Sequence, residues 1–338
     1  MTAPATLDLN EEALRDRVAR VLSVAMGRPI TVTGFEREGT PFATLFPADV
    51  LRLQIDGRQA LDVFLKHLGD EEQDHPDKLG PSREVSLYRD LFAGEELPVP
   101  RYLGSGMSPD TGRIELFLEY LDDWNLKYHD LASWYRAACE LGRLHAWFAE
   151  RPSAIEARPS LQRLGGEYAW SWARRAADEA ARRGPELKER LARLLNRYGP
   201  VAEVLEGADT TLVHNDLSPK NVLADRSADP VRICFVDWEC AGVGSGFLDL
   251  VNLSYGLPGD ERSQMSSAYL QGIEQAGGHV PPAVVVSRLE AACSAHKALW
   301  RLAHCGRWAL PEASVRDFCG EAEAAVDALS SESAGGGA

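Results

Sequence analysis

The sequence predicts an α+β fold in which strands come early in the chain and helices dominate the later part. Short apolar or alternating runs between residues 30 and 120 indicate strands, whereas apolar residues at helical spacing prevail from residue 122 onward. A length of 338 residues allows one large two-lobed domain or two modest ones. We therefore expect an N-terminal lobe over 1–121, a mostly helical C-terminal lobe over 122–330 and a small polar tail over 331–338 that is disordered.

The first lobe opens with a helix and continues with strands. Asn10, followed by two glutamates, is typical of a helix N-terminus, and helical spacing extends to Gly27. The third of the strand-like runs that follow ends at Lys66, and a variable loop over 69–80 then precedes a helix over 82–92 with Glu84 in its first turn. The expected strands cover 30–36, 50–55, 60–65, a short segment after 97–100, and 113–120.

The second lobe is predicted from helical spacing. An amphipathic helix is expected over 137–150, a pair of helices over 165–198, and three more over 262–276, 282–308 and 312–330. His296, Trp300 and His304 share one face of the 282–308 helix. Both a substrate-facing role and buried packing are open for these three side chains.

Net charge limits the partners of the chain. The formal charge is −15 and the isoelectric point is near 5.0, which argues against nucleic acid because phosphate backbones attract basic surfaces. An acidic balance is compatible with a cationic substrate, although it more often only keeps a protein soluble. The N-terminus lacks the plan of a signal peptide, and no apolar run is long enough to span a bilayer. We therefore expect no membrane partner and a cytoplasmic location.

A polar stretch between apolar segments carries the chemistry. Residues 212–223 read LVHNDLSPKNVL, and residues 233–239 read ICFVDWE. Apolar segments over 222–224 and 231–236 flank a polar turn that contains a proline, which predicts a hairpin. The hairpin would bring Asn221 and Asp237 together at its open end, with Asp216 on the loop just before it. Such side chains offer oxygen ligands that suit Mg²⁺ and a carboxylate that can accept a proton from a hydroxyl.

The HNDL stretch at 214–217, Asn221 five residues after Asp216, and the VDWE stretch at 236–239 together resemble the aminoglycoside phosphotransferase and choline kinase family. Members are small-molecule kinases with a protein-kinase-like, two-lobed fold, so the resemblance implies an antiparallel sheet in the N-terminal lobe and a mostly helical C-terminal lobe. The spacing also matches the kinase catalytic loop, in which the Asp serves as base and the Asn binds metal.

The resemblance implies a role for each matching residue. Asp216 would accept the proton of the acceptor hydroxyl, and Asn221 and Asp237 would hold Mg²⁺ on the phosphates of ATP. Lys66 would contact the α- and β-phosphates, and Glu84 would hold Lys66 in place. Residues 1–121 would then form the nucleotide-binding lobe.

Further positions would complete the site. Thr40 lies in a loop over 38–44 that is placed like the phosphate-covering loop of a kinase, although its single glycine departs from the Gly-rich pattern. Residues 118–122 resemble the hinge between the lobes, where the main chain of Glu119 and Leu121 would bond adenine. His214 and Asp249 are implied to support the catalytic loop.

The implied function is transfer of the γ-phosphate of Mg-ATP to a hydroxyl of a small molecule. Long, aromatic-rich helices give a slight preference for an antibiotic, an aminoglycoside or another natural product. A kinase of choline, an amino sugar or another metabolite stays open, since choline kinases favour an Asn at the position of Asn215. A peptide or protein kinase is disfavoured because Asp249 follows Asp237 after only 12 residues, which leaves little room for an activation segment. An inactive nucleotide-binding scaffold is disfavoured because the expected polar positions are filled.

Overall fold

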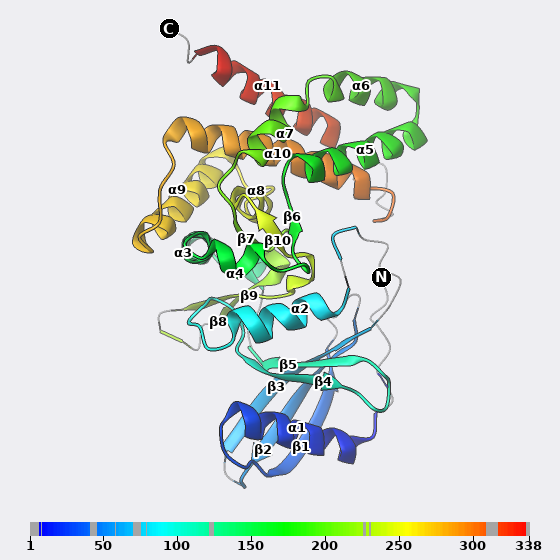
Figure 1. Cartoon of the computed structure of the whole chain (residues 1–338), viewed down its shortest axis with the longest axis vertical. Coiled ribbons are helices and arrows are strands. Elements are labelled where there is room, and N and C mark those ends of the chain that lie inside the picture. Colours follow the sequence, from blue (N-terminus) through cyan, green and yellow to red (C-terminus); the bar gives the residue numbers. More distant parts are fainter. Residues whose placement is uncertain are drawn as a thin grey trace. The chain divides into compact units, whose positions relative to one another are not determined.

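The computed structural model describes residues 7, 9–40, 46–57, 59–69, 76–78, 80–121, 125–225, 228–229, 231–308 and 317–335. The chain forms two compact units, shown in Figure 1. The first unit comprises residues 1–129 and 221–240, and the second comprises residues 130–220 and 241–338. The predicted α+β class is confirmed, whereas the lobe boundary near residue 121 stays a prediction.

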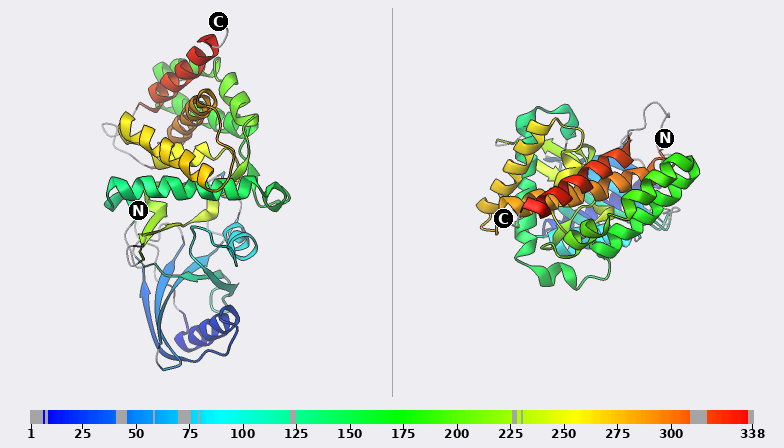
Figure 2. Two further views of the ribbon diagram at one scale, coloured as in Figure 1. Left: turned by 90° about the vertical axis from the view of Figure 1, so that its left-hand side faces the viewer. Right: turned by 90° about the horizontal axis from the view of Figure 1, so that it is seen from above.

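The first unit is built on an antiparallel sheet with the strand order β1-β2-β3-β5-β4. Its strands are β1 (Val32–Gly39), β2 (Ala48–Ile55), β3 (Gln59–Leu68), β4 (Tyr102–Met107) and β5 (Ile114–Glu119). The first three strands correspond to the three predicted runs, and the longest overhang is three residues. The helix α1 (Glu11–Ala25) packs on this sheet against β4 and β1 (Figures 1 and 2).

The packing of α1 follows from its sequence. Asn10 accepts a hydrogen bond from the Ala13 N–H at 3.0 Å and so caps the helix N-terminus, as the sequence predicts. Leu14, Val18 and Leu22 recur every fourth residue and are at most 1% exposed. Each buried aliphatic side chain of this kind stabilises the fold by about 1.5–3 kcal/mol.

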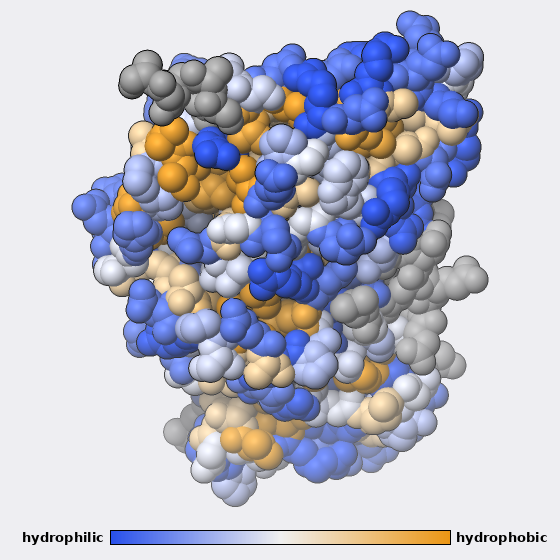
Figure 3. Space-filling view, turned by 45° about the horizontal axis from the view of Figure 1, so that its top comes forward, coloured by the Kyte–Doolittle hydropathy of each residue, from blue (hydrophilic) through white to orange (hydrophobic). Residues whose placement is uncertain are grey.

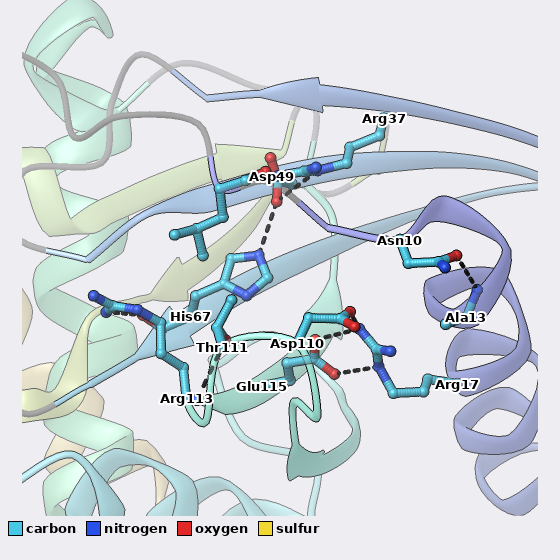
Figure 4. Close-up of polar contacts among 11 residues, drawn as sticks. Asn10, Ala13, Arg17, Arg37, Asp49, His67, Asp110, Thr111, Arg113 and Glu115 are labelled. Atoms are coloured by element: carbon cyan, nitrogen blue, oxygen red, sulfur yellow. Dashed lines mark hydrogen bonds and ion pairs between the residues drawn. The ribbon is translucent and has the colours of Figure 1, made fainter.

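Buried ionic contacts join α1 and the sheet strands of the first unit, as Figure 4 shows. Arg17 of α1 donates to both carboxylate oxygens of Glu115 on β5, at 3.0 and 2.9 Å. Asp49 of β2 lies 2.8 Å from the Nε2 atom of His67 on β3 and 3.0 Å from the Nε atom of Arg37 on β1. These pairs compensate buried charge in a sheet that carries one of the predicted nucleotide-binding residues on β3.

The rest of the first unit comes from two distant chain segments. The predicted helix over 82–92 is present as α2 (Ser82–Leu87), which continues as a π-helical turn, η1 (Tyr88–Phe92). The predicted hairpin is also present, with β8 (Val222–Asp225) pairing antiparallel to β9 (Arg232–Phe235). The remaining short elements are η2 (Leu126–Tyr128) and η4 (Trp238–Cys240), and η3 (Pro219–Asn221) spans the point where the chain passes from the second unit to the first.

The second unit is mostly helical, and α10 contacts α5, α7, α8 and α11 (Figures 1 and 2). Its helices are α3 (Leu131–Ala149), α4 (Pro152–Glu156), α5 (Gly166–Arg183), α6 (Pro185–Leu195), α7 (Gly199–Glu206), α8 (Phe247–Leu253), α9 (Gly259–Gln275), α10 (Ala283–His304) and α11 (Phe318–Gly335). A small sheet has the order β6-β10-β7, from β6 (Gln162–Arg163), β10 (Gly242–Gly244) and β7 (Thr211–Val213).

Helices α3 and α9 touch through two glycines. A Cβ atom on Gly142 would lie 2.0 Å from the main-chain oxygen of Tyr269, and one on Gly272 would lie 1.9 Å from that of Cys139. Both distances are far below van der Waals contact, so any larger residue would force the helices apart. This contact fixes α3 against α9 in the second unit.

The C-terminal tail and the membrane-spanning character of the helices were both subjects of prediction. α11 is helical to Gly335, so the helix replaces the start of the tail that the sequence predicts to be disordered, and residues 336–338 lie outside the described part. The face shown in Figure 3 is mostly polar, with apolar residues gathered in a few patches. Within the described residues, no helix has the length and apolar character needed to cross a membrane.

Candidate active site

Lys66, near the end of β3, lies at the centre of a buried ionic cluster in the first unit. Its Nζ atom donates to Glu84 Oε2 at 2.7 Å and to Asp237 Oδ1 at 2.6 Å. Glu84 comes from the first turn of α2, and Asp237 follows β9. The side chains of Lys66 and Glu84 are 11% and 3% exposed, against 31% for Asp237. The structure thus brings together three residues that the sequence assigns to nucleotide and metal binding.

Two side chains that the sequence did not single out extend this cluster. Lys78 contacts a carboxylate oxygen of Glu239. Arg83 donates to the main-chain oxygen of Glu239 at 3.1 Å. A small hollow beside them is lined by Lys78, Glu84, Glu239, Phe46, Leu68, Gly80 and Pro81. Lys78 lies in the variable loop over 69–80. The rarity of lysine in this chain was the one sequence feature that could have marked it as a candidate site residue.

Charge governs protonation in this cluster. Burial acts to lower the pKa of Lys66, but the carboxylates of Asp237 and Glu84 more than offset it, so this pKa lies well above its usual range. Burial raises the pKa of Glu84, and burial together with repulsion from Asp237 raises the pKa of Glu239. Three carboxylates accompany two lysine ammonium groups and the guanidinium of Arg83, so the formal charges of the cluster are balanced.

Asn221 and Asp237, the predicted metal ligands, lie at the open end of the β8–β9 hairpin. Val222 pairs with Phe235, and the Val236 N–H donates to the main-chain oxygen of Asn221 at 3.0 Å. Asp237 follows with a φ of 70°, a left-handed conformation that non-glycine residues adopt at a cost and that recurs at functional sites. The hairpin thus brings the two residues together as the sequence predicts.

The donor set at this hairpin end suits a hard cation. A carboxylate and a carboxamide provide the oxygen ligands that Mg²⁺ prefers, with its remaining positions taken by phosphate oxygens and water. Within the described ranges, no three or more His, Cys, Asp and Glu side chains gather closely enough to hold a metal ion by themselves. Asn221 and Asp237 therefore fit a metal ion whose other ligands come from a nucleotide and from water. This role stays a prediction.

The predicted hinge and phosphate loop are only partly described. The N–H of Glu119 donates to the main-chain oxygen of Arg101 at 2.9 Å, so this N–H is already engaged and does not face an adenine. The Glu119 carboxylate accepts two hydrogen bonds from Arg232, at 2.9 and 3.0 Å. Leu121 is buried, and the Thr40 N–H donates to the Ala48 oxygen at 3.0 Å. The predicted phosphate-loop residues 41–44 lie outside the described residues.

Asp216, the predicted base, follows β7 and belongs to the second unit. Its side chain is 26% exposed, and its Oδ2 atom lies 3.5 Å from the Nζ atom of Lys220. Its main-chain oxygen accepts a hydrogen bond from the Ser218 N–H at 2.9 Å, which closes a tight turn. A carboxylate that is partly exposed on a tightly turned loop can meet an incoming hydroxyl.

Asp249 of α8 holds the two residues before Asp216. Its carboxylate accepts the N–H of His214 at 2.7 Å and the N–H of Asn215 at 2.8 Å. Burial acts to raise the pKa of Asp249, but the His145 imidazole, whose Nε2 atom lies 3.4 Å from Oδ2, and the positive charges nearby lower it below its usual range. The carboxylate therefore stays ionised in the interior. This placement fits the supporting role implied for His214 and Asp249, and the role itself stays a prediction.

Four aromatic side chains pack together in the second unit, from α5, α10 and the turn after α10. The ring of His304 lies 4.1 Å from that of Trp300, 4.7 Å from that of Trp172 and 5.5 Å from that of Trp308, centre to centre. Burial lowers the pKa of His304 to about 4, so its imidazole is neutral at pH 7, while the charge of Asp216 acts on it in the opposite direction. The charge of the predicted base therefore acts on this aromatic cluster.

His296 belongs to the same face of α10 but not to that cluster. It is fully buried and packs against the ring of Tyr168, 5.2 Å away between centres. Burial and the charge of Lys297 lower the pKa of His296 well below its usual range. This environment supports the packing interpretation for His296.

Comparison with known protein families identifies the chain. A model of the phosphotransferase enzyme family matches residues 73–283, which is more than half of the chain. The chain belongs to the phosphotransferase enzyme family. The matched segment contains Glu84, Asp216, Asn221, Asp237 and Asp249 and begins after β3. Membership confirms that the predicted enzyme class, a phosphotransferase, is correct. No curated protein sequence matches the chain.

Solved structures of this phosphotransferase fold agree with the family. A choline kinase from Cryptosporidium parvum Iowa II superposes with a TM-score of 0.59 at 15% identity, covering 96% of each chain. The GDP complex of an aminoglycoside 2′-phosphotransferase superposes with a TM-score of 0.54 at 16% identity, covering 95% of this chain and 98% of the other. A macrolide 2′-phosphotransferase from Brachybacterium faecium superposes with a TM-score of 0.52 at 17% identity, covering 92% of this chain and 97% of the other. The predicted protein-kinase-like fold class is thereby confirmed.

Replacement of Lys66 by Met is expected to weaken nucleotide binding to the phosphotransferase by about 10- to 100-fold. A hydrogen bond between charged groups contributes about 1.5–3 kcal/mol, and about 1.4 kcal/mol corresponds to tenfold. Titration calorimetry with Mg-ATP measures the change, and Lys127→Met, at an exposed lysine of the same unit, is the control. An unchanged affinity in a folded Lys66→Met variant would refute the assignment of Lys66.

Proposed function

We propose that this phosphotransferase moves the γ-phosphate of Mg-ATP to a hydroxyl group of a small molecule. The observation that supports the proposal most directly is the double pairing of Lys66 with Glu84 and Asp237, because it places a lysine ammonium beside a predicted metal ligand. Both partners and Asn221 occupy the positions that the kinase pattern requires. An intact cluster of this kind supports an active enzyme over an inactive scaffold.

In the proposed reaction, the oxygen of the acceptor hydroxyl bonds to the γ-phosphorus while the bond from that phosphorus to the bridging oxygen breaks. ADP leaves, and Asp216 accepts the hydroxyl proton. Lys66 holds the α- and β-phosphates, and Glu84 holds Lys66. When bound at Asn221 and Asp237, Mg²⁺ neutralises phosphate charge. Because ATP is a substrate, we also propose a cytoplasmic location.

The surroundings of the proposed base favour one kind of acceptor. The guanidinium of Arg175 lies over the ring of Trp172, and the Nζ atom of Lys297 lies over the ring of Trp300, at 5.5 and 5.4 Å. Arg307 also acts on His304. These cations compete with a positively charged guest for the aromatic faces. Trp172, Trp300 and His304 are buried, so the part of the cluster that an acceptor can meet is Trp308, which is 43% exposed. An antibiotic or other natural product with an apolar or planar surface therefore suits this part better than a polycationic aminoglycoside or choline.

The test is an acceptor screen with γ-labelled ATP, and GTP as an alternative donor. The panel contains neutral natural-product alcohols, macrolides among them, together with kanamycin, choline, an amino sugar and a mixture of peptides. We expect Mg²⁺-dependent label on a neutral alcohol. Label on kanamycin or choline alone would overturn the acceptor class and leave the kinase intact. Label on peptides alone, or on no member of the panel despite nucleotide binding, would overturn the proposed function.

A further inference from the structure

Lys297, in the middle of α10, is a buried lysine for which the proposed reaction has no role. It is 1% exposed and ranks among the largest fully buried side chains of the described residues. A buried ammonium is unfavourable unless hydrogen-bonded acceptors replace its water, and an apolar side chain would fill the same space at less cost. Its presence therefore calls for a specific interaction.

Two acceptors of Lys297 lie on one residue of the catalytic loop. Its Nζ atom donates to the main-chain oxygen of Asn215 at 2.7 Å and to the side-chain oxygen Oδ1 of Asn215 at 2.9 Å. The Nδ2 atom of Asn215 in turn donates to the hydroxyl of Tyr168 on α5 at 2.9 Å. Asn215 is thus held from two helices, in addition to the hydrogen bond from its N–H to Asp249.

The held residue has an unfavourable backbone conformation. Asn215 has a φ of 67°, in the left-handed region, which asparagine tolerates better than most residues but still enters at a cost. Asp216 is the next residue, so a change of φ at Asn215 would redirect the Asp216 carboxylate. A displacement of about 1 Å of a reacting group can lower a rate by about 100-fold.

We propose that Lys297 is a positioning residue, which keeps Asn215 in its left-handed conformation and thereby aims the carboxylate of Asp216. The role of Lys297 in catalysis rests on the proposed function, whereas its stabilisation of the loop conformation at Asn215 does not. Lys297 also lies over the ring of Trp300, so one side chain contacts both the catalytic loop and the aromatic cluster.

The first experiment measures Lys297→Met by hydrogen exchange and by kinetics, with Lys188→Met, at an exposed lysine of α6, as the matched control. We expect the amides of residues 214–216 to exchange at least about tenfold faster, with no comparable change in α3 or α9. We also expect kcat to fall by about 10- to 100-fold with an unchanged KM for ATP. Exchange as slow as in the unaltered protein would overturn the proposal, and faster exchange with an unchanged kcat would overturn its catalytic part.

A second pair of variants covers the case in which Lys297→Met does not fold. Asn215→Gly and Asn215→Ala both remove the side-chain oxygen that Lys297 bonds, but glycine accepts a positive φ and alanine resists it. We expect the alanine variant to show faster exchange in the loop and a kcat at least about fivefold lower than the glycine variant. Equal exchange rates would overturn the proposal. If the unaltered enzyme phosphorylates no acceptor, only the proposed function fails, because the exchange measurements still test the hold on the loop.

Discussion

Replacement of Asp216 by Asn is expected to lower kcat by about 10²–10⁴-fold, because an amide cannot take the proton of the acceptor hydroxyl. The fold should tolerate the change. The Asp216 side chain is partly exposed, and its 3.5 Å ion pair with Lys220 is of a kind that contributes at most about 1 kcal/mol. Turnover of the acceptor identified in the screen, measured at saturating Mg-ATP, gives the effect on kcat.

A control separates loss of the base from general damage to the loop. Asp209→Asn changes an exposed aspartate shortly before β7 and should leave kcat within about twofold. Asp216→Asn should also bind Mg-ATP with unaltered affinity, since the nucleotide residues named above belong to the first unit. Turnover near that of the unaltered enzyme in the Asp216→Asn variant would refute the base assignment.

Local sequence signals predicted much of this site because its parts are close in the sequence. The polar turn between apolar segments predicted the β8–β9 hairpin, and the register that pairs Val222 with Phe235 brings Asn221 beside Val236. The contact between Lys66 and Glu84 was implied by the family resemblance, and it joins a strand end to the next helix along the chain. In both cases a short connection leaves few alternative arrangements.

Contacts over long separations could not be predicted in the same way. Lys297 and Asn215 are 82 residues apart, and Lys78 and Glu239 are 161 apart. Helical spacing places Lys297 on a helix but does not say which loop that helix meets. The shared face of His296, Trp300 and His304 was predicted, yet all three are buried, and only packing around α10 decides which of them nears Asp216.

Replacement of Asp249 by Asn is expected to destabilise the second unit by about 3 kcal/mol. Both carboxylate oxygens accept main-chain N–H groups, from His214 and Asn215, whereas an amide has one acceptor oxygen and would turn its NH₂ group toward the other N–H. A buried group left unsatisfied costs about 1–3 kcal/mol, and removal of one member of a buried ionic network costs about 3–5 kcal/mol. Urea unfolding followed by tryptophan fluorescence measures the loss, with Asp178→Asn at an exposed site of α5 as the control.

The pH dependence of the free energy of unfolding distinguishes loss of the carboxylate charge from a change of side-chain shape in the Asp249→Asn variant. The pKa of Asp249 is lower in the folded chain than usual, because the nearby side chains of His145, His214 and Lys297 outweigh burial. A group of this kind stabilises the fold fully above its unfolded pKa, about 3.9, and loses that effect as the pH falls through its lower folded pKa. The gap in stability between the unaltered chain and Asp249→Asn should therefore be constant above about pH 5 and shrink below about pH 4. A gap that stays the same down to pH 3 would show that shape, rather than the ionised carboxylate, holds the loop.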